Sequence, residues 1–164
     1  MRLPELTRRR LLAATGMAAA VPWLASCGAE AQAKSFPVSK SEAEWRRALT
    51  RDQYYVLREA GTERAFTSPL NKEKRKGTFA CAGCGQGLYS SAHKYDSGTG
   101  WPSFWQAINA KAVGISTDYK IGYPRTEVHC ARCGGHLGHI FGDGPRPTGK
   151  RHCINGLALT FEPA

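Results

Sequence analysis

Two short segments, Cys81–Gly85 (CAGCG) and Cys130–Gly134 (CARCG), decide the fold. Each is a Cys-x-x-Cys turn followed by a glycine, which tolerates the positive φ that lets backbone N–H groups turn toward the sulfurs. Each turn supplies half of a tetrahedral ligand set, and four thiolates favour zinc, with iron as the other candidate. We therefore predict a structural zinc site that has no open position for a substrate, formed by Cys81, Cys84, Cys130 and Cys133.

The spacing of the two turns indicates a fold larger than a zinc ribbon. The 45 residues between them (positions 85 to 129) exceed the roughly 15 to 20 of a compact ribbon. Two disulfides, or one redox-active pair of thioredoxin type, are the alternatives to a metal. Duplication of the motif favours the metal, because a single redox pair does not explain it.

The sequence around the turns is typical of a small antiparallel β domain with short N-terminal helices. Ser41 and Glu44 form a capping-box pattern that predicts a helix over 41–50, and a second helix is expected over 52–60. Apolar runs separated by turn sequences then predict strands. These runs cover residues 78–80, 113–116, 127–129 and 157–161.

Length and composition indicate one globular domain with a basic surface. The chain has 164 residues, of which 41% are hydrophobic, and Lys and Arg outnumber Asp and Glu by 23 to 13. Such an excess suits nucleic acid or an anionic membrane surface. The N-terminal segment decides between these partners.

Residues 1–33 are predicted to be an export signal and tether, followed by the folded body at 34–164. Arg8–Arg10 precede an uncharged apolar run at 13–25, which is too short for a spanning helix and resembles a twin-arginine signal. The run ends in a lipoprotein-like box at Cys27, which predicts cleavage before Cys27 and lipidation of its thiol. An ordinary cleavage site at 31–33 is the alternative.

An exported protein belongs in the periplasm or cell envelope, away from genomic DNA. The basic surface is therefore expected to face lipid headgroups or solvent, and nucleic acid is not an expected partner. A lipid on Cys27 would also attach the body to the membrane.

Cys153 is the thiol that remains when four cysteines bind metal and Cys27 is lipidated. It follows Lys150, Arg151 and His152, and nearby cations lower the pKa of a thiol by stabilising the nucleophilic thiolate. This pattern predicts a catalytic cysteine. The alternative is an inert cysteine buried on the last strand.

Four motifs, taken together, resemble the B-type methionine sulfoxide reductases, which act on the R epimer. They lie at 81–85, 97–104 (SGTGWPSF), 130–141 (CARCGGHLGHIF) and 149–155 (GKRHCIN), and the resemblance spans 41–161. It implies a two-sheet antiparallel β fold, reduction of methionine-R-sulfoxide in oxidised proteins or peptides, a structural zinc and no organic cofactor. We also expect a monomer.

The resemblance also assigns roles to individual residues. Cys153 matches the nucleophile, and the thiolate is expected to attack the sulfoxide sulfur and become a sulfenic acid. Three donors, His136, His139 and Asn155, are expected to bind the sulfoxide oxygen, and Trp101 and Phe104 are expected to form an apolar wall. Arg151 is the expected cation beside the thiol, and Asp143 is the acid expected to orient it. Asp118, Arg125 and Lys150 are expected on the surface or in turns.

Thr99 stands where many members of that family carry a resolving cysteine. Threonine forms no disulfide, so the sulfenic acid is expected to require a thioredoxin-fold reductant or another external thiol. Attack by an unmodified Cys27 is the alternative. From a different functional class, the rival hypothesis is a non-catalytic, zinc-stabilised binding module of the envelope that presents its basic surface.

Overall fold

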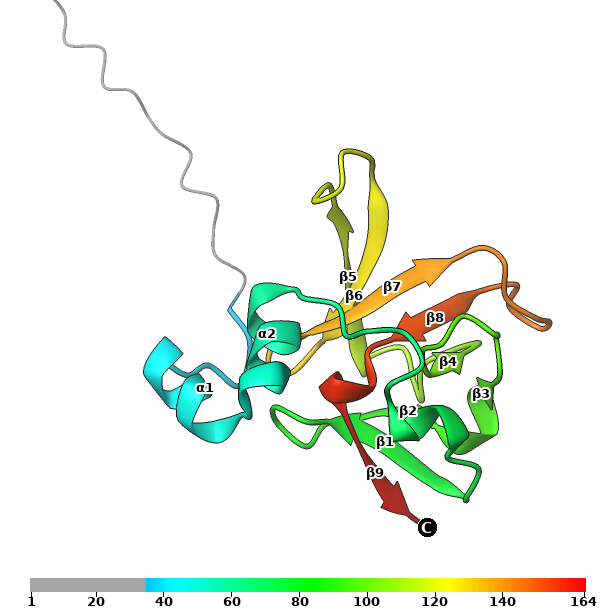
Figure 1. The fold of residues 1–164 in the computed structure, drawn as a ribbon, viewed down its shortest axis with the longest axis horizontal. Helices are drawn as coiled ribbons and strands as arrows, with labels where there is room; N and C mark the ends of the chain where they lie inside the picture. The colour runs from blue at the N-terminus through cyan, green and yellow to red at the C-terminus, as the bar shows by residue number, and fades with distance from the viewer. Residues whose placement is uncertain (1–34) are drawn as a thin grey trace, which may run out of the picture. The chain divides into compact units, whose positions relative to one another are not determined.

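The computed structural model describes residues 35–164 (Figure 1), so the predicted signal, tether and Cys27 lie outside the described residues. Two helices come first, α1 (Glu42–Ala48) and α2 (Arg51–Glu59). Each begins with a capping box, from Ser41 and Glu44 for α1 and from Thr50 and Gln53 for α2. Both predicted helices are confirmed. No helix among the described residues has the length and apolar content needed to cross a bilayer.

The described part of the chain contains nine strands in two antiparallel sheets, as expected. The three-stranded sheet has the order β2-β1-β9, and the six-stranded sheet has the order β3-β4-β8-β7-β6-β5. The strands of the first sheet are β1 (Gly77–Cys81), β2 (Gly87–Ser90) and β9 (Leu159–Pro163). Those of the second are β3 (Lys94–Tyr95), β4 (Ser103–Phe104), β5 (Val113–Asp118), β6 (Arg125–Cys130), β7 (His136–Phe141) and β8 (Arg151–Ile154).

The predicted strand at 157–161 differs in its first part. A 3-10 turn, η3 (Gly156–Ala158), precedes β9, which begins only at Leu159. The carboxylate of Glu63 accepts hydrogen bonds from the backbone N–H groups of Gly156 and Leu157 at 2.5 and 3.0 Å. These N–H groups are therefore engaged by a distant side chain and not by a sheet ladder.

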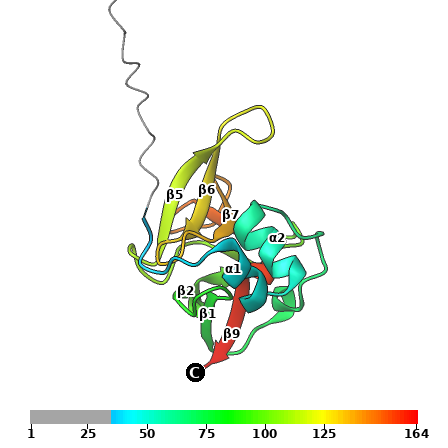
Figure 2. The same ribbon diagram turned by 90° about the vertical axis from the view of Figure 1, so that its left-hand side faces the viewer.

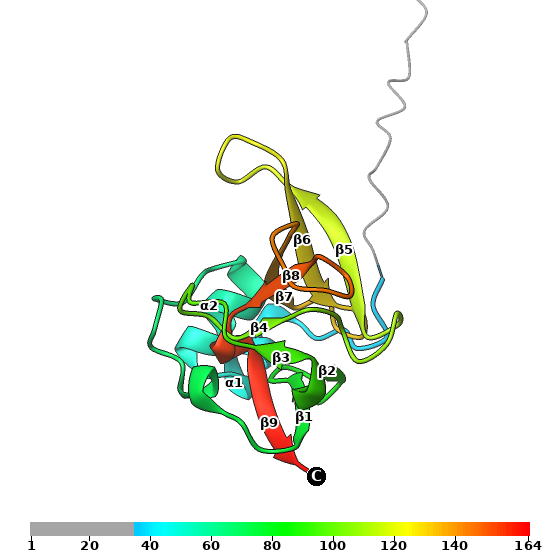
Figure 3. The same ribbon diagram turned by 90° about the vertical axis from the view of Figure 1, so that its right-hand side faces the viewer.

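The core lies where the sheets and helices meet. Phe79 and Tyr89 from the first sheet pack on Phe104 from the second, with ring centroids 5.0 and 4.4 Å apart. The helices add Trp45 and Leu57 to the same cluster. Both helices lie on one side of the body, and β3 and β4 lie on the other (Figures 2 and 3). Burial of each large apolar side chain stabilises the fold by about 1.5–3 kcal/mol.

Candidate active site and metal site

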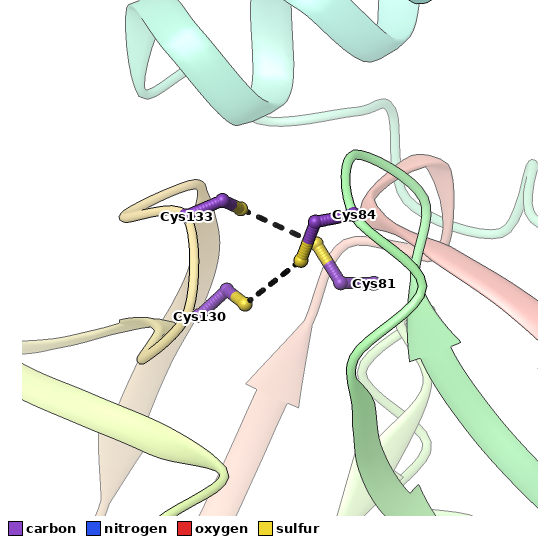
Figure 4. Close-up of side chains that lie close together, drawn as sticks. All are labelled: Cys81, Cys84, Cys130 and Cys133. Atoms are coloured by element: carbon purple, nitrogen blue, oxygen red, sulfur yellow. Dashed lines mark hydrogen bonds between the residues drawn. The ribbon is translucent and has the colours of Figure 1, made fainter. Parts of the chain in front are cut away.

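The four predicted metal ligands converge on one point (Figure 4). Their sulfur atoms all lie within 4.8 Å of one another, and the closest pairs are Cys81–Cys133 at 3.7 Å and Cys84–Cys130 at 3.6 Å. A tetrahedral zinc with Zn–S bonds of about 2.3 Å requires sulfurs about 3.8 Å apart. The cluster therefore has the size and ligand set of a structural zinc site. All four are free thiols, so the two-disulfide alternative is not supported.

The metal site joins the two sheets. β1 ends at Cys81 and β6 ends at Cys130, so one turn extends from each sheet. Gly85 and Gly134 follow the turns with φ of 72° and 68°, the left-handed conformation that glycine adopts freely. Arg132 of the second turn donates to the carbonyl oxygen of Cys84 in the first at 3.2 Å. A bound metal would thus connect elements that are far apart in the sequence.

Cys153 opens into a small pocket on the six-stranded sheet. The cavity has a volume of about 140 Å³. Four of its lining residues, Trp101, His139, Cys153 and Asn155, belong to the predicted site. The other four are Thr62, Arg125, Gly138 and Phe141. The sequence predicted the first four of these lining residues, but it did not predict that the other four line the pocket.

The strand register explains why the thiol lies near His139. Ser103, Cys153, His139 and Glu127 are cross-strand partners in one row over β4, β8, β7 and β6. Directly opposed side chains of antiparallel strands share one face of the sheet. Residues from four separate strands are thereby brought to one face.

Phe104 is not part of the pocket, and the expectation that it forms the apolar wall is wrong. Its register partner is His152, whereas Ser103 is the partner of Cys153. Because successive side chains of a strand point to opposite faces, Phe104 points into the core, where it is fully buried. Phe141 and Trp101 supply the apolar surface of the pocket instead.

The same alternation corrects the expected environment of the thiol. His152 lies on the opposite face, bonded to the hydroxyl of Tyr89 at 3.2 Å, and burial lowers its pKa to about 4. Lys150 is exposed to solvent. Burial raises the pKa of Cys153, opposed by Thr99, whose Oγ1 lies 4.0 Å from Sγ, and by Arg151. Burial therefore favours the thiol over the thiolate at Cys153, and the predicted depression of its pKa by three cations is wrong.

Arg151 and Asp143 form the expected ion pair. Two hydrogen bonds of 2.9 Å join the guanidinium to the carboxylate, and this contact lowers the pKa of Asp143. The guanidinium also lies over the ring of Phe141, 4.4 Å from its centroid. Arg151 is thus held in place on the face of β8 that carries Cys153.

Asp118 and Arg125 belong to the site, contrary to the expectation that they are surface or turn residues. Oδ2 of Asp118 accepts from Nε2 of His139 at 2.8 Å and from Nη2 of Arg125 at 2.5 Å. Burial lowers the pKa of His139, which favours the neutral imidazole. Since a carboxylate can only accept, Nε2 carries the proton and Nδ1 is left as an acceptor.

His136 forms a second carboxylate–histidine pair, with Glu127. The Nδ1 to Oε1 distance is 2.7 Å, and this bond lowers the pKa of Glu127 to about 2. Ser116 donates to the other carboxylate oxygen at 2.6 Å. His136 does not line the pocket, but its ring lies 5.3 Å from that of His139, and its buried Nε2 has no hydrogen-bond partner among the described residues.

Glu63 organises the remaining pocket residues and was not recognised from the sequence. Its backbone carbonyl accepts from the indole N–H of Trp101 at 3.1 Å, and its backbone N–H donates to Oδ1 of Asn155 at 2.9 Å. Nδ2 of Asn155 donates to the carbonyl of Leu137 at 3.0 Å. Asn155 therefore has at most one N–H left for a substrate, and we assign it mainly a positioning role. No local pattern identified Glu63, because its partners lie 38 to 94 positions away.

The fold and site define a class of protein: a small two-sheet β domain in which a four-cysteine metal centre holds the sheets together and a separate cysteine faces a pocket. This is the arrangement of a thiol-dependent oxidoreductase. The SelR domain family matches residues 49–163, and the chain belongs to this family.

Relatives of known name cover the same region. A protein of Leptospira interrogans named peptide methionine sulfoxide reductase MsrB is 52% identical over 128 residues, which cover 78% of this chain and 98% of the relative. Proteins of the same name from Methanosarcina barkeri and Thiobacillus denitrificans are each 54% identical. They cover 76% of this chain, and the matches span 88% and 94% of those relatives.

Proposed function

We infer that this protein is an enzyme that reduces methionine sulfoxide in peptides or proteins to methionine, with Cys153 as the nucleophile. The observation that carries the inference is Cys153, the one cysteine of the described residues outside the metal cluster, which opens into a small pocket lined by Trp101 and His139. Three relatives, each more than half identical over this region, carry the name of that activity. The R epimer is the proposed substrate.

The first half-reaction needs no proton beyond that of the thiol itself. His139 is neutral and lies across from Cys153 in the register, so it is placed to accept the thiol proton. The thiolate attacks the sulfoxide sulfur, and the imidazolium, stabilised by Asp118, returns the proton to the oxygen, which leaves as hydroxide when the S–O bond breaks. The hydroxide then adds to the sulfur of Cys153 and breaks the new bond between the two sulfurs, with its electron pair returning to the substrate sulfur. The products are methionine and a sulfenic acid on Cys153. His136, held by Glu127, supports the position of the His139 ring.

An external thiol completes the cycle. Attack on the sulfenic acid releases water and forms a mixed disulfide, and a second thiol reduces this disulfide and restores Cys153. Thr99 occupies the place near Cys153 from which an internal cysteine would act, and the four other described cysteines belong to the metal cluster. A thioredoxin-fold protein is the proposed reductant.

The metal has a structural role in this account. Cys81, Cys84, Cys130 and Cys133 would hold zinc, which stabilises the junction of the two sheets and takes no part in the chemistry.

Residues 1–33 are proposed to export the domain at 34–164 to the periplasm or cell envelope. The arginines before an apolar run and the box ending at Cys27 support a signal with lipid attachment. We propose that the enzyme acts there as a monomer on oxidised proteins. Labelling with radioactive palmitate, compared between the full chain and Cys27→Ser, tests the anchor, and equal labelling of the two would contradict it.

The non-catalytic binding module is not favoured, because a basic surface alone does not account for a thiol and a carboxylate-bound histidine that line the same pocket. The test is turnover of the separated R and S epimers of N-acetyl-methionine sulfoxide with dithiothreitol. We expect turnover of the R epimer alone, lost in Cys153→Ser but retained in Cys27→Ser. Absence of turnover in the unaltered protein would contradict the proposed function.

A further inference from the structure

The tip of the β5–β6 hairpin exposes three large apolar side chains. Tyr119, Ile121 and Tyr123 are 67%, 50% and 59% exposed, within five consecutive residues. Clustered apolar exposure of this kind marks interaction sites on soluble proteins. We call residues 119–123 the hairpin tip.

The hairpin tip has a defined position. The backbone N–H of Lys120 donates to Asp118 at 2.7 Å, and that of Gly122 donates to the carbonyl of Tyr119 at 2.9 Å. Nζ of Lys120 donates to the carbonyl oxygens of Glu59 and Ala60, at the end of α2, at 3.3 and 3.0 Å. The apolar side chains are thus carried by a turn that is held by its own hydrogen bonds and by the bonds of Lys120 to the end of α2.

The hairpin tip adjoins the pocket that holds Cys153. Arg125, which begins β6 just after the tip, lines the pocket, and Asp118, just before it, holds His139. Thr62, which follows the Lys120-bound end of α2, also lines the pocket. All views show the hairpin projecting from the two-sheet body (Figures 1–3).

The size of the pocket leaves most of a peptide substrate outside it. Its volume of about 140 Å³ is below the roughly 300–1,000 Å³ of typical small-molecule sites. It suits one side chain. The residues on either side of a bound methionine sulfoxide therefore lie at the rim, to which the hairpin tip belongs.

We propose that the hairpin tip is a docking surface for apolar side chains that flank methionine sulfoxide in an unfolded polypeptide. This inference rests on the proposed function. A polypeptide fits the surface better than a membrane does, because the only cation of the tip, Lys120, is bound to backbone carbonyls. Attraction to anionic headgroups relies on clustered basic residues. Apolar side chains are the neighbours that methionine has in a protein core, which unfolding exposes.

The test compares two substrates. One is N-acetyl-methionine-R-sulfoxide, and the other is an unstructured peptide with leucine and phenylalanine beside the sulfoxide. In the triple variant Tyr119→Ser, Ile121→Ser, Tyr123→Ser, we expect kcat/KM for the peptide to fall roughly tenfold through a higher KM, because apolar contacts are lost. Turnover of the small substrate should stay within about twofold.

Ile115→Ser is the matched control. Ile115 lies on the same hairpin and is 60% exposed. It precedes Ser116 in β5, and because successive side chains of a strand point to opposite faces, it points away from the face of the sheet that carries Ser116, Glu127 and Cys153. Its peptide kinetics should equal those of the unaltered protein, and thermal melting should show that both variants fold.

Three outcomes overturn the proposal. They are unchanged peptide kinetics in the triple variant, an equal loss on both substrates, and loss of binding to vesicles of phosphatidylglycerol without loss of peptide turnover. Failure of the unaltered protein to reduce either substrate would instead refute the proposed function itself.

Discussion

At the scale of single residues, two carboxylates determine the state of the histidines in the site. Asp118 holds Nε2 of His139, and Glu127 holds Nδ1 of His136. The two acids bind opposite ring nitrogens of the two histidines, and only His139 lines the pocket. The thiol of Cys153 can then act as the acid, and the neutral imidazole of His139 as the base that accepts its proton.

Replacing Asp118 with asparagine should lower kcat/KM by roughly tenfold to a hundredfold, since the imidazolium formed during the reaction loses its stabilising charge. Asp118 raises the pKa of His139 against the larger effect of burial. Its loss lowers that pKa further, so the acidic limb of the pH–rate profile should move to lower pH. Asp52→Asn, an exposed control, should leave the profile unchanged. An unshifted limb in Asp118→Asn would show that His139 is not the base.

The pKa of Cys153 provides a second residue-scale prediction. Burial outweighs Arg151, so the midpoint of pH-dependent alkylation by iodoacetamide should lie above the ordinary value near 8.5. Arg151→Met should raise the midpoint further and slow alkylation at pH 7 by roughly threefold or more. Lys150→Met, whose side chain is exposed, should have no effect. Equal shifts of the alkylation midpoint in the two variants would contradict the assignment of Arg151, and not Lys150, to the face of β8 that carries Cys153.

At the scale of elements, local signals predicted the helices well, whereas long-range contacts decided the rest. The capping box at Ser41 identified the start of α1 because its partners lie three residues apart. In contrast, the turn η3 depends on Glu63, which is 93 positions from Gly156. The burial of Phe104 likewise depends on the register of β4 with β8, which no single strand sequence reveals.

Glu63→Ala tests the long-range connection that shapes η3 and the pocket. The variant leaves one buried and one partly buried backbone N–H group, those of Gly156 and Leu157, without an acceptor, which should lower the free energy of unfolding by about 2–4 kcal/mol. Chemical denaturation measures this change. Glu59→Ala, at the exposed end of α2, should cost less than about 0.5 kcal/mol. Equal stability of the two variants would show that Glu63 does not anchor the segment.

At the scale of the whole molecule, the metal cluster joins the two sheets and the active site occupies one of them. The cluster was predictable because two nearly identical turns imply one shared ion. Cys153 could be proposed as the nucleophile because it was the remaining thiol of the body. The walls formed by Thr62, Arg125 and Phe141 were not, since they come from separate elements that only the tertiary fold brings together.

Removing the metal should unfold the domain. Binding of a structural zinc contributes roughly 10–16 kcal/mol, which matches or exceeds the roughly 5–15 kcal/mol of stability of a typical domain. Cys84→Ser, or treatment with a strong chelator, should abolish the cooperative thermal transition. A chelated protein of unchanged melting temperature would contradict the structural role of the cluster.

A single turnover without reductant shows whether Cys153 is the residue that the substrate oxidises. The protein is mixed with excess methionine-R-sulfoxide peptide, trapped with dimedone, digested and analysed by mass spectrometry. We expect one methionine formed per protein molecule and dimedone attached to Cys153 alone. Methionine formed in the same amount by Cys153→Ser, or a trapped sulfenic acid on any other cysteine, would contradict it.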